Sequence, residues 1–118
     1  MAKAENLIFR MQNLLDAIEA DTGIATLDPT SKDILKFVGR AEIDQAEVNV
    51  SDIAGNIKFG SPAKIMGRLA KLERDGWLRA VVDPADGRAK LITLSQRSRK
   101  AFGKMSDGLC RLLTNAKH

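Results

Sequence analysis

Basic side chains gather in one part of this sequence. Between Ser61 and Lys104 there are eleven Lys and Arg against four Asp and Glu, so this stretch carries a net charge of +7 and the rest of the chain −3. Lysine and arginine bind phosphate oxygens, and arginine also forms paired hydrogen bonds with guanine edges. These residues therefore indicate an anionic partner.

The spacing of the first basic residues predicts a helix over about Pro62 to Asp75. Ser61 is a good N-cap, Pro62 fits the first helical position, and Gly76 is a typical C-terminal stop. Ile65, Leu69 and Leu72 fall on one side of this helix. The opposite side holds basic and small residues, namely Ala63, Lys64, Gly67, Lys71 and Arg74.

Such a face fits the major groove of DNA, because small residues let the backbone approach and the basic ones reach phosphates or guanine edges. The hydroxyl of Ser61 and the free N–H groups at the helix start suit a phosphate oxygen. The alternative is an ordinary amphipathic helix whose basic face is solvated.

A second basic position follows in an expected β-hairpin. Strand patterns at Trp77 to Val82 and Lys90 to Leu94 flank the turn formers Asp83 to Gly87. Arg88 comes just after this turn, where its side chain can enter a minor groove or follow its phosphates. Asp86 is placed to pair with Arg88. An ordinary charged hairpin tip is the alternative.

The remaining patterns predict the elements that hold this helix and hairpin. A helix is expected over Ala4 to Ala20, and another from a cap at Thr30 or Ser31 to about Glu42. Val48 to Val50 suggests a short strand. Ser51 is expected to cap a short helix that includes Ile53, Ala54 and Ile57, which completes a helix-turn-helix with the helix after Ser61. Ser95 is expected to cap the last helix.

Length and composition exclude several classes. The 118 residues fit one domain, 1–118, with an N-terminal helix at 1–22, a core at 27–95 and a C-terminal helix at 96–118. We find no membrane span or signal peptide and expect a cytoplasmic protein. One cysteine and one histidine cannot form a disulfide or a structural zinc site, so no metal or cofactor is expected. The sequence shows no nucleophile and base, no Gly-rich phosphate loop and no pair of carboxylates at a spacing that would form an active site, so an enzyme is not expected.

Two stretches resemble the MarR family of bacterial transcription factors. Leu72 to Leu78 (LERDGWL) is similar to the end of that family's recognition helix. Asp83 to Ser95 (DPADGRAKLITLS) fits its wing pattern, which is Asp-x-Arg, five residues, then Leu followed by Thr or Ser. The resemblance covers about Leu27 to Lys100.

This resemblance implies a mainly α fold with a small β-hairpin wing, an α+β winged helix-turn-helix flanked by dimerisation helices. It also implies a homodimeric, sequence-specific regulator of transcription, a repressor or a dual regulator, that binds double-stranded DNA. Ser61 to Lys71 would then read the major groove and Arg88 the minor groove. The residues expected at the DNA are Ser51, Ser61, Ala63, Lys64, Gly67, Arg68, Lys71, Arg74, Asp86, Arg88 and Lys90.

Three features depart from the family pattern. The family usually has a polar or basic residue at Gly67, an apolar one at Arg68, and a shorter turn than Ile57 to Gly60. Lys64 or Lys71 can take over the recognition expected at Gly67. Arg68 can either extend to a phosphate or pair within the protein.

The terminal helices are expected to dimerise the chain. Their apolar stripes would pack across a two-fold axis, although packing within one chain is the alternative. The stripes consist of Leu7, Met11, Leu14, Ile18, Phe102, Met105, Leu109 and Leu112. Because these helices are shorter than in larger relatives, an effector pocket is less expected. Cys110 lies beside the stripe as a small buried thiol, with a redox sensor as the alternative, and His118 is expected to be a mobile terminus.

A different class of function fits the same basic surface. The winged helix would then be a protein-interaction adaptor that docks an acidic partner instead of DNA. Salt-sensitive binding of DNA fragments separates the two hypotheses.

Overall fold

The chain divides into two compact units in the computed structural model. The structure describes the backbone of residues 3–116 and the side chains of residues 6–115. One unit comprises Asp28–Ser98. The other comprises the residues up to Leu27 together with those from Arg99 onward.

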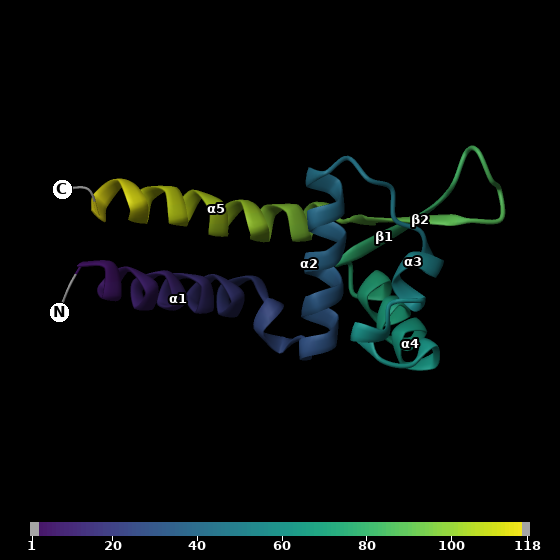
Figure 1. Ribbon diagram of the computed structural model, residues 1–118, viewed down its shortest axis with the longest axis horizontal. Coiled ribbons are helices and arrows are strands. Elements are labelled where there is room, and N and C mark those ends of the chain that lie inside the picture. Colours follow the sequence, from purple (N-terminus) through teal and green to yellow (C-terminus); the bar gives the residue numbers. More distant parts are fainter. Residues whose placement is uncertain (1–2, 117–118) are drawn as a thin grey trace. The chain divides into compact units, whose positions relative to one another are not determined.

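The Asp28–Ser98 unit contains the predicted helix-turn-helix and hairpin (Figure 1). In chain order its elements are α2 (Pro29–Ile43), α3 (Val50–Ala54), a 3-10 helix (Ile57–Phe59), α4 (Pro62–Arg74), β1 (Leu78–Val82) and β2 (Lys90–Leu94). The strands pair in antiparallel register, with Leu78 opposite Leu94 and Val82 opposite Lys90. This arrangement is the predicted mainly α winged helix with a two-stranded wing.

The core of this unit lies where α2, α3 and α4 meet the hairpin. Ile34, Leu35 and Val38 give α2 a buried face, as its pattern predicted. From α4, the side chains of Ile65 and Leu72 are almost completely buried. Burying an aliphatic side chain of this size contributes about 1.5–3 kcal/mol, so this packing fixes which side of α4 faces outward.

Two of the predicted helix caps are wrong. The N-cap of α2 is Asp28, not Thr30 or Ser31, and its side chain accepts a hydrogen bond from the Ser31 amide. Asp28 is favoured because the following Pro29 takes the first helical position, where a missing N–H costs nothing. The correct cap therefore lies earlier in the chain than predicted.

The start of α3 also differs from the prediction. Asn49 is its N-cap and forms a capping box with Asp52, so Ser51 lies inside the helix. The capping box satisfies two backbone donors at once, which a single Ser hydroxyl cannot do. The expected strand at Val48–Val50 is reduced to one bridge between Asn49 and Leu91. Ile57 lies outside α3 and is 90% exposed.

The other unit is built from α1 (Lys3–Thr22), a 3-10 helix (Ile24–Thr26) and the part of α5 (Gln96–Ala116) from Arg99 onward. In this unit α1 and α5 run side by side in opposite directions (Figure 1). Leu14 packs against Gly108, and Lys104 Nζ lies 3.3 Å from Asp21 Oδ2. The helices therefore use part of their apolar stripes within one chain.

All eight residues of the predicted dimerisation stripes are only partly buried in the single chain. Cys110 is exposed, so the expected buried thiol is wrong, since its side chain lies off the face that packs inward. His118 lies outside the described residues.

Within residues 3–116, no helix is long and apolar enough to cross a membrane, and no cluster of His, Cys, Asp or Glu could hold a metal ion.

The close approach of α1 and α5 predicts different effects for two glycines of α5. A Cβ at Gly108 would lie 3.0 Å from Leu14 Cδ2, whereas one at Gly103 would meet nothing within 4 Å. Gly108→Val should therefore lower the free energy of unfolding by about 1–3 kcal/mol. Gly103→Val, the matched control, should leave it unchanged or raise it by a few tenths of a kcal/mol, because valine is a slightly better helix former than glycine. Urea denaturation measures both, and equal effects would contradict this packing.

Candidate nucleic-acid interface

The N-terminal end of α4 is set by three consecutive residues. Gly60 has a φ of 108°, which favours glycine, and Ser61 is the N-cap, as predicted. The Ser61 Oγ accepts a hydrogen bond of 3.3 Å from the Lys64 amide. A Cβ at Gly60 would also lie 3.1 Å from Lys64 Cδ, so the glycine leaves room for that side chain.

The outward face of α4 has the predicted composition. Its apolar residues Ile65, Leu69 and Leu72 are buried. The residues predicted on the opposite side are all exposed, namely Ala63, Lys64, Gly67, Lys71 and Arg74. A Cβ at Gly67 would meet no heavy atom within 4 Å, so internal packing does not require this glycine. Its absence of a side chain leaves the backbone of α4 open to a partner.

Arg68 pairs within the protein, which was one of its two predicted outcomes. Its Nε lies 3.0 Å from Asp28 Oδ2, and the two side chains are 38% and 39% exposed. The same carboxylate accepts a hydrogen bond of 2.6 Å from the Ser31 hydroxyl and one of 3.4 Å from the Ser31 amide. The N-cap of α2 is therefore bonded to the middle of α4.

These bonds shift the acidity of Asp28. Partial burial on its own raises the pKa of the carboxyl, but the hydrogen bonds from Ser31 and Arg68 and the charge of Arg68 outweigh it. The pKa falls from its ordinary value of 3.8 to about 2. The ionised form is therefore the one that the fold prefers.

This shift predicts how stability depends on pH. Because the pKa is lower in the folded state, Asp28 stabilises the fold above about pH 4, and this contribution is lost as the pH falls towards about 2. Asp28→Asn keeps a capping oxygen but cannot ionise. It should lower the Tm at neutral pH by roughly 2–5 °C and flatten the loss of Tm between about pH 4 and 2. Thermal melts followed by circular dichroism test this. If the variant loses Tm between about pH 4 and 2 as steeply as the wild type, the prediction is contradicted.

The tip of the wing is ordered by two aspartates. Asp83 Oδ1 accepts a hydrogen bond of 2.9 Å from the Ala85 amide, and Asp86 Oδ1 accepts one of 3.0 Å from the Arg88 amide. Asp86 therefore bonds to the backbone amide of Arg88. The sequence instead suggested an ion pair between Asp86 and the Arg88 guanidinium. Such a turn within the chain is the usual bonding of Asp in tight loops. The Arg88 side chain is exposed, as is Lys90 at the start of β2.

The C-terminal end of α4 has contacts that sequence reasoning missed. Arg97 Nη1 donates a hydrogen bond of 2.9 Å to the carbonyl oxygen of Asp75, the C-cap of α4, and its guanidinium stacks 3.8 Å from the centroid of the Trp77 ring. Ser98 Oγ donates a 2.6 Å hydrogen bond to the Trp77 carbonyl. Arg74, whose Nε lies 3.8 Å from Asp75 Oδ1, stays largely exposed.

Lys58 is a further basic residue that the prediction left out. It is exposed in the 3-10 helix directly before α4, and its amide donates a hydrogen bond to Asn56 Oδ1. The only signal for it was a lysine in the turn that precedes the N-cap. Ser51, which was predicted at the DNA as a cap, is exposed within α3.

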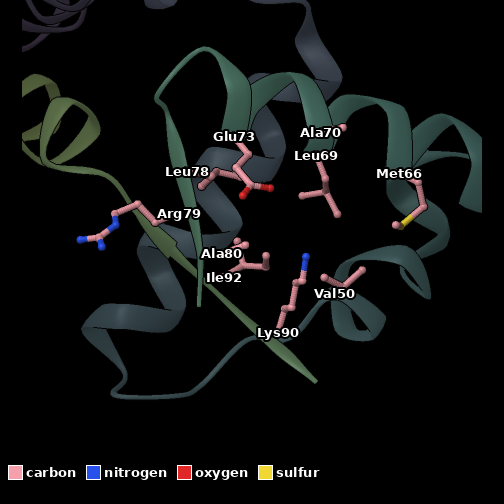
Figure 2. A pocket seen from close by; sticks show the side chains of 10 residues that line it. All are labelled: Val50, Met66, Leu69, Ala70, Glu73, Leu78, Arg79, Ala80, Lys90 and Ile92. Atoms are coloured by element: carbon pink, nitrogen blue, oxygen red, sulfur yellow. The ribbon is translucent and has the colours of Figure 1, made fainter. Parts of the chain in front are cut away.

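A small cavity of about 140 Å³ lies between α4 and the hairpin (Figure 2). Apolar side chains such as Leu69, Leu78 and Ile92 form much of its lining. Glu73 and Lys90 supply charged groups to the lining, whereas Arg79 points away from the other labelled side chains (Figure 2). Lys90, predicted at the DNA, therefore also contributes to this cavity.

No protein-family model matches the sequence, and no curated protein matches it. Solved structures do match. The transcriptional regulator Tm0710 from Thermotoga maritima is 19% identical, with a TM-score of 0.64 over 95% of this chain and 73% of that one. MepR of S. aureus bound to ethidium bromide is 19% identical, with a TM-score of 0.67 over 94% of this chain and 77% of that one.

A complex of S. aureus MepR with DNA is also similar. It is 20% identical to this chain and has a TM-score of 0.65, covering 94% of this chain and 80% of that one. These neighbours are transcriptional regulators of the MarR family. The similarity extends over α2 to the wing and over the terminal helices, since it covers nearly the whole chain. The chain thus has the winged helix-turn-helix fold of MarR-family regulators.

Proposed function

We propose that this chain is a transcriptional regulator that binds specific sequences in double-stranded DNA. The observation that carries the proposal is the exposed face of α4, where basic residues surround an uncovered backbone at Gly67. A helix of this kind fits the major groove. The likeness to a regulator solved in complex with DNA supports the same function.

The proposed roles follow from exposure and charge. Lys64 and Lys71 flank Gly67 on the outward face of α4 and reach base edges or phosphates when the helix lies in the groove. Lys58 and the capped start of α4 at Ser61 contact the phosphate backbone. Arg88, at the tip of the wing, reaches the minor groove beside it.

We also propose that the regulator is a homodimeric repressor that acts in the cytoplasm. Large apolar side chains of the terminal helices are exposed in the single chain, with Ile8 44%, Phe9 57% and Leu113 49% exposed. Burying them between two copies would pair the reading helices, as two half-sites about one DNA turn apart require. Light scattering tests this, and a monomer at micromolar concentration would contradict it.

The experiment for the DNA-binding proposal is fluorescence anisotropy with labelled duplex fragments selected from a random pool. The affinity should fall steeply with salt, with a slope near −0.9 for each phosphate contact. A polyglutamate chain of equal charge serves as the competitor. The adaptor hypothesis gains if polyglutamate displaces the DNA at equal charge concentration, and the proposal fails if no fragment binds.

A further inference from the structure

Two arginine contacts connect α4 and its C-cap to other parts of the same compact unit. Arg68, in the middle of the helix, bonds to the Asp28 carboxylate, and Arg97 bonds to the carbonyl of Asp75 at the C-cap. Asp28 is the first residue of its compact unit, and Arg97 is the last but one. The two ends of this unit are thus both bonded to α4 or its cap.

The Arg68 contact is built into a small network. Asp28 Oδ1 accepts the Ser31 hydroxyl hydrogen, and Oδ2 accepts from Arg68 Nε and the Ser31 amide. The Ser31 side chain that completes it is buried. An arginine held by a carboxylate in this way is oriented by that carboxylate, since charge-assisted bonds are the stronger and more directional ones.

The Arg97 contact combines a hydrogen bond with a stacked ring. Its guanidinium bonds to one of the carbonyls that a helix end leaves without an internal partner, and it lies over the buried indole of Trp77. The planar guanidinium can stack on the ring while one of its N–H groups donates to the carbonyl, a geometry that lysine does not reproduce.

We propose that Arg68, with Asp28, and Arg97 are positioning residues that fix the orientation of α4 for reading DNA, and that neither arginine contacts phosphate. The inference rests on the proposed function. It assigns to Arg68 a role different from that of the other basic residues of α4. It also adds Arg97 and Asp28, which no sequence motif singled out, to the determinants of binding.

The sign of one substitution separates this proposal from simple electrostatics. Asp28→Asn removes a negative charge from a DNA-binding unit and would free Arg68 for a phosphate, so electrostatics alone predicts tighter binding. Positioning predicts weaker binding, by roughly three- to tenfold, because α4 loses an anchor. Asp33→Asn, at an exposed residue of α2, is the matched control and should bind DNA as tightly as the wild type or slightly more tightly.

A double-mutant cycle measures the coupling. Arg68→Met should weaken binding about as much as Asp28→Asn, and the double variant should be no weaker than either, because one contact is removed in each case. The slope of affinity against salt should stay that of the wild type. Tighter binding by Asp28→Asn, or a slope about 0.9 shallower in Arg68→Met, would overturn the proposal.

Arg97 is tested through the only tryptophan of the chain. Arg97→Ala and Arg97→Lys should both shift the fluorescence emission of Trp77 to longer wavelength and weaken DNA binding by a similar factor. If Arg97 instead contacts phosphate, the lysine variant should keep most of the affinity. That result would overturn the assignment of Arg97.

Amide hydrogen exchange keeps these claims testable without DNA. Asp28→Asn and Arg97→Ala should each speed exchange of the α4 amides, whereas Asp33→Asn should not. If these two variants exchange faster than the wild type but the wild type binds no DNA, the proposed function is refuted and the anchors stand. Unchanged exchange in both variants would refute the anchors themselves.

Discussion

Gly67→Glu is expected to abolish duplex binding, with a loss of at least about 100-fold in affinity, while the fold remains intact. Gly67 lies in the middle of the outward face of α4, and the space around its Cβ position is empty. A glutamate there fits the free protein but brings a carboxylate against phosphates and base edges, where like charges cost several kcal/mol. Anisotropy with a selected duplex measures the loss.

Stability and binding should move in opposite directions in this variant. Replacing a glycine in an exposed helix interior removes a penalty of about 0.5–1 kcal/mol, so Gly67→Glu should unfold at the same or a higher temperature than the wild type. Gly67→Gln introduces a side chain of nearly the same shape without the charge, so it distinguishes the steric effect of the side chain from electrostatic repulsion. Wild-type affinity in Gly67→Glu would show that this face of α4 does not approach DNA.

Arg88→Ala is expected to weaken duplex binding by about tenfold or more and to make the salt slope about 0.9 shallower. The side chain is exposed at the wing tip, and Asp86 bonds to the Arg88 amide, so among the described residues no carboxylate is paired with this cation. An arginine in a narrow minor groove gains from the enhanced negative potential there. A salt titration measures both quantities.

The matched control for Arg88 is Arg40→Ala, which removes an exposed arginine from α2, outside the proposed interface. It should change the affinity by less than about twofold and leave the slope of the wild type. Equal effects of the two substitutions would mean that only the net charge matters, and would remove the wing from the interface. Melting temperatures of both variants should stay near that of the wild type, because both side chains are exposed.

The sequence predicted those parts of the site that depend on neighbours in the chain. The outward face of α4 follows from a helical period, and its start follows from Ser61 and Pro62, whose capping roles are local. The hairpin follows from strand patterns on either side of Asp83 to Gly87. Local rules also failed where two caps competed, because Asp28 and Asn49 make better bonds than the later Ser and Thr residues.

The contacts that orient α4 could not be predicted in this way. Arg68 and Asp28 are forty residues apart, and Arg97 and Asp75 are twenty-two apart, so their pairing depends on how the helices pack. The sequence left Arg68 with two outcomes for that reason. The sequence also predicted the wrong group of Arg88 as the partner of Asp86, because spacing does not say whether a carboxylate bonds to a side chain or to the backbone.

The central claim is that α4 and the wing read duplex DNA, and footprinting of the wild type on a selected fragment at base resolution tests it most directly. We expect protection of guanine N7 in two major-groove segments about 10 base pairs apart, each beside a protected stretch of minor groove. In Arg88→Ala only the minor-groove protection should be lost. Weak protection spread evenly along the backbone, with no protected bases, would contradict the account.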